Sequence, residues 1–193
     1  MRIVSGKYKG RTIKTPFNLQ VRPTTDFAKE SLFNILNNKV DFDGLKVLDL
    51  FSGTGNIGYE FISRGVDDIT MVELNSENVY FIKNTLKILG FEKAKVHRYD
   101  VFRYLKNHDT SFDLIFADPP FDNDFIPKLH NAIFSGNFLS PYGIFVLEHD
   151  SDLDFDTLKG FTEKRNYGKV AFSFYEMDEH PQTTELLTSN SNS

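Results

Sequence analysis

The chain has 193 residues, a hydrophobic content of 40%, no cysteine and a formal net charge of −5. This length supports one domain with a sizeable core, and the lack of cysteine excludes disulfides, thiolate metal sites and a cysteine nucleophile. No apolar run approaches the roughly 18 residues of a membrane span, and no long apolar segment follows the basic N-terminus, so we expect a cytoplasmic protein without a secretory signal.

The first element in the chain is a basic arm, residues 1–16. Its alternating pattern, with Gly6 and Gly10 near a turn, predicts a short β-hairpin. Residues 1–14 hold five basic and no acidic side chains, while the remainder holds 17 basic and 27 acidic ones, a net −10. Such an arm can bring a polyanion to one edge of an acidic domain, but charge alone fits a solvated hairpin equally well. The basic residues are Arg2, Lys7, Lys9, Arg11 and Lys14.

A helix follows the arm, and strand and helix patterns then alternate from residue 44. Thr24 and Thr25 cap the first helix, whose apolar face includes Phe27 and Leu32. The last two strands, around the turn at 166–168, form an antiparallel pair. The pattern predicts a doubly wound α/β sheet after an N-terminal hairpin and helix. The expected divisions are 1–40 (N-terminal β-hairpin and helix extension), 41–178 (main domain) and 179–193 (polar, disordered tail).

A glycine-rich loop joins the first strand of this sheet to a helix. "DLFSGTGNIG" contains G-x-G-x-x-G at Gly53, Gly55 and Gly58, in the strand–turn–helix context that the motif needs. Enzymes that bind dinucleotides and enzymes that bind S-adenosylmethionine both use it. Asp49 favours S-adenosylmethionine, because a carboxylate here would repel a pyrophosphate but attract a cationic ammonium and sulfonium.

Acidic residues also close the next two strands. Glu73 ends "MVEL", where it could accept hydrogen bonds from ribose hydroxyls, and Asp100 follows "VHRY", where it could accept one from an adenine amino group. Val101 or Phe102 would pack against the adenine ring. Each acid alone is more often a helix cap or a surface charge. Three of them at successive strand ends favour a binding site at the carboxyl edge of the sheet.

The fourth strand ends in Asp118-Pro119-Pro120-Phe121. These residue types suit methyl transfer to an exocyclic amine. The lone pair of such a nitrogen is delocalised into the ring, which makes the nitrogen a poor nucleophile. A carboxylate that accepts a hydrogen bond from the amine N–H counters this delocalisation. The Pro119 carbonyl is a second acceptor on a stiff backbone, and Phe121 offers a stacking face for a flipped base. These residues therefore indicate a reaction site rather than only a turn.

The segments "MRIVSGKYKGR", "RPTTDFAKESLFNIL", "VLDLFSGTGNIGYEFISRG", "VELN" and "DPPF" together resemble the RsmD family, over residues 1 to about 176. This family belongs to the S-adenosylmethionine-dependent methyltransferases with a DPPF or NPPY signature. The resemblance implies a Rossmann-like sheet of seven strands, six parallel and one antiparallel near the C-terminus. It also implies methyl transfer to N2 of the guanine at position 966 of 16S ribosomal RNA, within assembling small-subunit particles.

The resemblance further implies roles for particular residues. Asp118, Pro119, Pro120 and Phe121 would be catalytic at the target base, and the basic arm would bind RNA. No metal is expected, and we expect a monomer. Cofactor contacts would come from Arg22, Thr24, Asp49, Phe51, Gly53, Gly55, Glu73, Leu74, Asp100 and Val101.

Three other functions compete with this one. A related amino-methyltransferase could act on adenine N6 or a protein glutamine, although such enzymes usually resemble Asn-Pro-Pro-Tyr at the site. A non-catalytic RNA-binding assembly factor is disfavoured by the intact acids at the strand ends. A dehydrogenase is disfavoured by Asp49 and by the lack of an obvious catalytic histidine or Tyr-Lys pair. The scattered histidines are expected at the surface: His97, His108, His130, His149 and His180.

Overall fold

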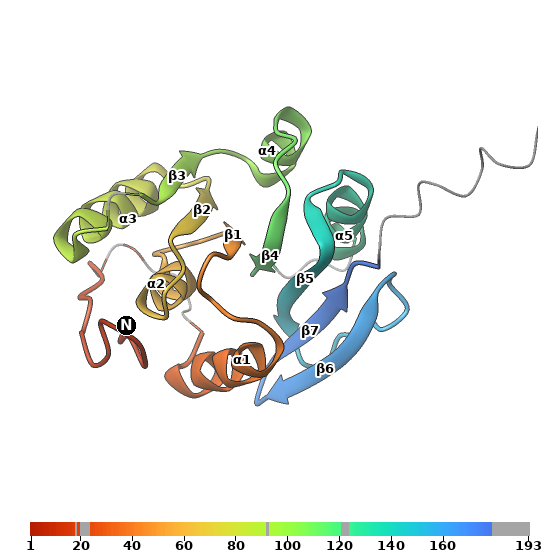
Figure 1. Cartoon of the computed structure of the whole chain (residues 1–193), viewed down its shortest axis with the longest axis horizontal. Coiled ribbons are helices and arrows are strands. Elements are labelled where there is room, and N and C mark those ends of the chain that lie inside the picture. Colours follow the sequence, from red (N-terminus) through yellow and green to blue (C-terminus); the bar gives the residue numbers. More distant parts are fainter. Residues whose placement is uncertain (18, 20–23, 92, 121–123, 179–193) are drawn as a thin grey trace, which may run out of the picture.

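A sheet of seven strands forms the centre of the computed structural model, which describes residues 1–17, 19, 24–91, 93–120 and 124–178. The strand order is β3-β2-β1-β4-β5-β7-β6 (Figure 1). β7 runs antiparallel to both of its neighbours, and the other six strands share one direction. This confirms the predicted fold class. The strands are β1 (Lys46–Leu50), β2 (Asp68–Glu73), β3 (Lys95–Arg98), β4 (Phe112–Ala117), β5 (Leu139–Asp150), β6 (Phe161–Tyr167) and β7 (Val170–Glu176).

Helices cover both faces of the sheet, as a doubly wound topology requires (Figure 1). Successive side chains of a strand point to opposite faces, so Val47 and Leu48 of β1 belong to different apolar clusters. The Val47 cluster packs against α1 (Asp26–Lys39), α2 (Asn56–Ser63) and α3 (Ser76–Leu89). The Leu48 cluster packs against α4 (Val101–Asn107) and α5 (Phe125–Ser135).

The first helix begins where the sequence predicts. The Thr25 side chain accepts a hydrogen bond from the Ala28 amide at 3.2 Å, which satisfies one of the free donors of the first turn. The prediction that Phe27 lies on the buried face of this helix is wrong, because its side chain is 70% exposed. The buried stripe instead runs through Ala28, Leu32 and Phe33, and the Phe27 ring lies beside Tyr167 at 5.9 Å.

The predicted N-terminal hairpin is present in a short form: one antiparallel bridge joins Arg2 and Thr12, and three backbone hydrogen bonds connect residues 1–3 to residues 10–13. Its tip lies at the C-terminal ends of α2 and α3, where the Tyr8 hydroxyl donates to the Leu89 carbonyl at 3.0 Å. Gly6 has φ +78°, and a Cβ there would lie 1.8 Å from the Ser63 carbonyl oxygen, so only glycine fits. The arm is therefore packed along the helices and shares their core.

A buried ion pair joins the arm to two helices. Lys29 of α1 and Glu60 of α2 are 1% and 0% exposed, and Lys29 Nζ lies 3.7 Å from Glu60 Oε2. Lys29 Nζ also donates to the Arg2 carbonyl at 2.6 Å, while Glu60 accepts from the Val4 and Ser5 amides at 3.0 Å each. Burial lowers the pKa of Lys29, against the opposing effect of Glu60.

Two of the histidines expected at the surface are buried, so that expectation is wrong for them. His130 is 4% exposed and stacks on Phe134 at 4.2 Å. His149 is 0% exposed, with its Nε2 2.8 Å from Ser173 Oγ and its Nδ1 2.8 Å from the Asp150 carbonyl. Burial lowers the pKa of both, which favours the neutral ring, and a neutral imidazole with satisfied nitrogens is compatible with a core. His180 lies outside the described residues.

Two other predictions concern membrane-spanning segments and the C-terminal tail. No helix among the described residues is long and apolar enough to cross a membrane. The prediction of a disordered tail at 179–193 concerns residues that lie outside the described part.

Glu60→Ala should lower the free energy of unfolding by about 3–5 kcal/mol, because it leaves the Lys29 ammonium buried without its partner. Chemical denaturation would measure this. Asp67→Ala is the control, since it removes the partner of Lys93 from a pair whose side chains are 64% and 72% exposed. The control should cost about 0–1 kcal/mol. Equal costs for the two variants would show that the buried pair does not hold the arm.

Candidate active site

The carboxyl ends of β1, β2, β4 and β5 open into a cavity of about 340 Å³. It lies on the face covered by α1 and α2, and its wall includes Thr24 and Thr25, which precede α1, and Asn56 and Ile57 at the start of α2. Eight of the predicted site residues line it: Thr24, Asp49, Phe51, Gly53, Glu73, Asp118, Pro119 and Pro120. The other lining residues were not predicted: Thr25, Ser52, Thr54, Asn56, Ile57, Asn78, Phe116, Glu148 and Val170.

Asp49 is the most deeply buried acid of the predicted cofactor site. It lies on β1, is 1% exposed, and its Oδ2 has no hydrogen-bond partner among the described residues. Burial raises the pKa of Asp49 to about 8, and the charges of Asp118 and Glu73 add to this increase. A buried carboxylate oxygen without a partner is suited to a cationic ligand group.

The glycine loop has the backbone geometry that its motif predicts. Gly53 and Gly55 have φ of 53° and 85°, in the left-handed region that favours glycine. A Cβ at Gly58 would lie 2.5 Å from the Met71 Cε, so this glycine lets α2 approach β2 closely. Phe51 also has positive φ, 59°, which is uncommon for a side chain of this size and is a form of strain found at functional sites.

Glu73 is fixed against the glycine loop. Its Oε2 accepts a hydrogen bond from the Gly53 amide and its Oε1 accepts one from the Asn75 amide, both at 2.8 Å. Each carboxylate oxygen can accept more than one hydrogen bond. Glu73 is therefore held in place and keeps capacity for the hydroxyls of a ribose.

Four other predicted cofactor residues do not line the cavity. Asp100 caps α4 by accepting from the Arg103 amide at 3.0 Å, and Val101 is 5% exposed in the core under α4. Leu74 is 62% exposed, and Gly55 caps the start of α2. Their cofactor contacts, and that of Arg22, which lies outside the described residues, stay predictions.

An aromatic cluster lies next to the cavity. The rings of Phe51 and Phe102 lie 5.6 and 5.0 Å from that of Phe125 at the start of α5. Phe51 also lines the cavity, so this cluster offers an apolar wall at the edge of the sheet.

The residues predicted for the acceptor follow β4. The Asp118 amide donates to the Leu50 carbonyl at 3.4 Å, so the DPP segment starts directly beside the end of β1. Pro119 is buried and Pro120 is exposed. Phe121 lies outside the described residues, and its stacking role stays a prediction.

Glu148 is the acid that the sequence reasoning missed. It lies on β5, is 4% exposed, and accepts a hydrogen bond from the Thr24 hydroxyl at 2.7 Å. It comes near the end of the apolar run "IFVLEHD". The rule applied to Asp49, Glu73 and Asp118, an acid at the end of a buried strand, would have found it.

The five basic residues of the arm are exposed. Arg2 pairs with Asp26 at the start of α1 at 3.1 Å, near the cavity. Lys7 and Lys9 lie at the arm's tip, where the Lys7 amide donates to the carbonyl of Ser63 at the far end of α2. Within the described ranges, no group of three or more His, Cys, Asp or Glu residues could hold a metal.

Known proteins resemble this chain in sequence and in fold. A family model, "Conserved hypothetical protein 95", matches residues 1–176. "Ribosomal RNA small subunit methyltransferase D" of Buchnera aphidicola is 31% identical over 154 residues, which are 80% of this chain and 78% of that protein. The chain belongs to the RsmD family. The "putative rRNA methyltransferase YlbH" of Bacillus subtilis is 36% identical over 183 residues, which are 91% of this chain and 98% of that protein.

The solved structure described as "Putative methyltransferase yhhF from Escherichia coli" superimposes with a TM-score of 0.82 at 25% identity. The match covers 93% of this chain and 99% of that one. The RsmD resemblance read from the sequence is thus confirmed. The chain has the Rossmann-like fold of S-adenosylmethionine-dependent methyltransferases, which confirms the predicted cofactor, and the buried Asp49 and the glycine loop fit that cofactor.

The affinity for S-adenosylmethionine should rise with pH towards about 8. Asp49 is largely protonated below that pH in the free protein, and a cationic ligand favours the carboxylate, so binding releases a proton. Calorimetry at several pH values, in buffers of different ionisation enthalpy, would count the protons. Asp49→Asn should bind S-adenosylmethionine more weakly and should lose the proton release that comes from Asp49. Proton release that is unchanged in the variant would contradict the assignment of this proton to Asp49.

The same substitution should change stability in the absence of ligand. The pKa of Asp49 is raised in the folded chain, so the wild type loses stability as the pH rises from about 4 to about 8. Asp49→Asn should lack this loss and unfold at higher denaturant concentration at pH 8. A loss of stability in the variant that increases with pH as in the wild type would contradict the shift.

Proposed function

We propose that this chain transfers a methyl group from S-adenosylmethionine to the exocyclic N2 of a guanine in 16S ribosomal RNA. One observation carries the proposal: Asp118 and Pro119 share a single cavity with the buried Asp49 and the glycine loop. This shared lining supports the proposal, because transfer requires acceptors for an amine next to a site for a cationic methyl donor. The RNA target is supported by the names of the relatives, and the substrate would be the small-subunit particle assembling in the cytoplasm.

In this proposal each part of the cavity has a separate task. Asp49 neutralises the cationic end of the cofactor, and Glu73 holds its ribose. The bound cofactor supplies a methyl group whose C–S bond breaks as the N–C bond forms, with the electron pair left on sulfur. Asp49 is 1% exposed, so water is largely excluded from this carboxylate, which strengthens its electrostatic contact with the cationic end of the cofactor.

Asp118 and Pro119 prepare the nitrogen. A carboxylate that accepts one N–H bond and a carbonyl that accepts the other orient the amine and stabilise the positive charge that develops on it. Nitrogen releases one proton after transfer, and Asp118 is the acceptor beside it. The proline at 119 has no backbone N–H that would compete for the base.

The exposed arm gives the RNA a separate hold. Its basic side chains neutralise phosphates, which supplies affinity without reading sequence. The tip lies at the far end of α2 from the cavity, so it acts on RNA away from the target base. We propose that a monomer makes these contacts, together with surfaces of the particle.

Asp118→Ala should lower methyl transfer by about 10²–10³-fold, because it removes the acceptor of the amine. Radiolabelled donor and small-subunit particles that lack the modification would measure this, followed by mapping of the labelled nucleotide. Cofactor affinity, measured by calorimetry, should remain. Asp109→Ala, an exposed acid before β4, is the control and should transfer normally. Label on protein or adenine would contradict the proposed acceptor.

Replacing Lys7, Lys9 and Arg11 together by Ala should weaken RNA binding and lower the slope of log affinity against log salt by about 2, since each single-strand phosphate contact contributes about 0.7. The turnover number at saturating RNA should not change, because the tip is remote from the cavity. Filter binding at several salt concentrations would measure the slope.

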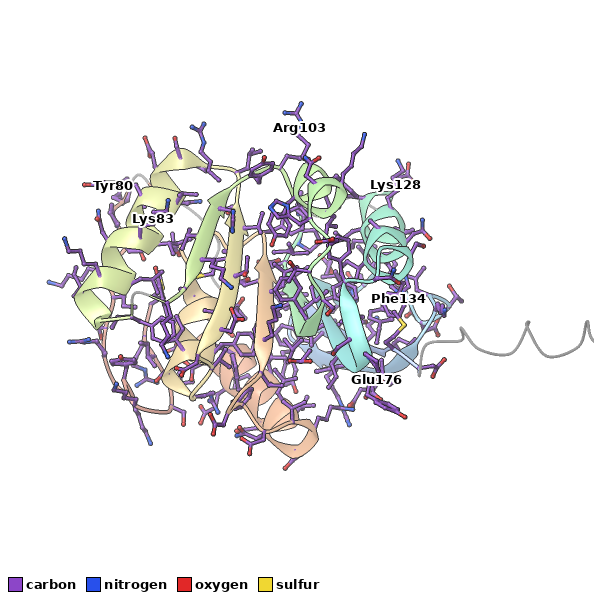
Figure 2. All side chains as sticks on the ribbon, turned by 45° about the horizontal axis from the view of Figure 1, so that its top comes forward. Tyr80, Lys83, Arg103, Lys128, Phe134 and Glu176 are labelled. Atoms are coloured by element: carbon purple, nitrogen blue, oxygen red, sulfur yellow. The ribbon has the colours of Figure 1, made fainter. Side chains whose placement is uncertain are left out.

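The matched control replaces three exposed lysines on the other side of the sheet: Lys106, Lys128 and Lys159. Figure 2 shows Lys128 projecting outward from α5. The change in net charge is the same, so a specific effect requires that the control keep the slope. Equal slopes for the two triple variants would remove the arm from the RNA interface.

A further inference from the structure

Glu148 lies next to Asp118 in the sheet. Leu147 of β5 pairs with Ala117, the last residue of β4; Glu148 is the next residue of β5, and Asp118 is the first residue after β4. Side chains at equivalent positions of neighbouring parallel strands point to the same face. Both residues line the cavity, and Glu148 is 4% exposed. Two carboxylates therefore lie side by side where the target base must enter.

We propose that Glu148 is the residue that selects guanine over adenine, by accepting a hydrogen bond from the guanine N1–H. This inference rests on the proposed function, because it needs N2 beside Asp118. The Watson–Crick edge of guanine presents N1–H and the N2 amine as neighbouring donors, which match two neighbouring carboxylates. Adenine presents the bare N1 lone pair next to its amine, and a carboxylate facing that lone pair would repel it.

The orientation of Glu148 is fixed by a chain of hydrogen bonds. The Thr24 hydroxyl donates to Glu148 Oε2 at 2.7 Å, and Asn56 Nδ2 donates to the Thr24 carbonyl at 3.3 Å. Lys29 Nζ in turn donates to Asn56 Oδ1 at 2.8 Å. Lys29 is held by its ion pair with Glu60, so the series of hydrogen bonds extends from the buried ion pair to the cavity.

These linked hydrogen bonds make Thr24 and Asn56 positioning residues for Glu148. An ionised carboxylate is acceptor only, and a donor on one oxygen sets the direction of the other. A flipped base is read by hydrogen bonds to its Watson–Crick edge, and a site built for a donor rejects an analogue that lacks it. Discrimination by Glu148 then depends on how firmly Thr24 holds it.

The test compares guanine with 2-aminopurine at the target nucleotide of reconstituted small-subunit particles. 2-Aminopurine keeps the exocyclic N2 amine but has no hydrogen on N1. The wild type should prefer guanine on the order of 100-fold in kcat/KM. Glu148→Gln should reduce this preference at least tenfold, because an amide can donate to a bare N1. The intrinsic reactivity of each amine cancels when the two proteins are compared.

Controls separate selectivity from folding. Glu176→Gln makes the same chemical change at the end of β7, where the side chain is 43% exposed, and should keep the wild-type preference (Figure 2). Thr24→Val should reduce the preference by a smaller factor, an effect that neither general destabilisation nor weaker cofactor binding would produce, because both act equally on the two substrates. If Glu148→Gln does not fold, the wild type and Thr24→Val still decide.

Two results would overturn the inference: equal use of guanine and 2-aminopurine by the wild type, or an unchanged preference in both Glu148→Gln and Thr24→Val. Methylation of guanine N2 without discrimination at N1 would remove this inference and leave the proposed function standing. Absence of any methylation at guanine N2 would remove both.

Discussion

The buried pair of Lys29 and Glu60 connects the parts of the molecule that the site needs. Glu60 holds the arm through two backbone amides, and Lys29 holds the start of α1 against α2. Taking two charges out of water is costly, and their attraction offsets the cost only when additional hydrogen bonds satisfy both groups. Here each charge has several partners. The pair therefore helps to fix the arrangement of three segments, together with exposed or partly buried contacts such as those of Arg2 with Asp26 and of the Lys7 amide with Ser63.

In the cavity, by contrast with the ion pair, the charged groups all have the same sign. Four carboxyl groups line it: Asp49, Glu73, Asp118 and Glu148. The burial of Asp49, and after it the charges of Asp118 and Glu73, disfavour negative charge on Asp49, which raises its pKa. A cationic ligand relieves this cost. The same acids that disfavour the empty, ionised site therefore increase its preference for a positively charged methyl donor.

Much of the fold could be predicted from the sequence, because its signals are local. Strand and helix periods, the loop at Gly53 and the acid at each strand end depend on neighbouring residues alone. Phe27 and His149 were misjudged because their burial depends on how α1 and β5 pack, which no local period records. The hairpin of the arm is short, since at its tip the Lys7 amide and the Tyr8 hydroxyl bond to helix ends rather than to a second strand.

The candidate site shows the same division. The acids at the ends of β1, β2 and β4 were found, because an apolar run followed by an acid is visible in the sequence. Asn56 and Thr24 act through a hydrogen-bond chain that begins at Lys29, and such a chain exists only once α1 and α2 are packed. Residues that support others across elements carry no sequence signal of their own.

The contact between Gly6 and Ser63 fixes the distance along the surface from the tip of the arm to the cavity. α2 has eight residues and thus spans about 12 Å, with Asn56 at the cavity and Ser63 under the tip of the arm. An RNA that touches both ends must bridge that interval. In the proposed complex, the length of α2 would therefore set the spacing between the target base in the cavity and the phosphate that the arm contacts.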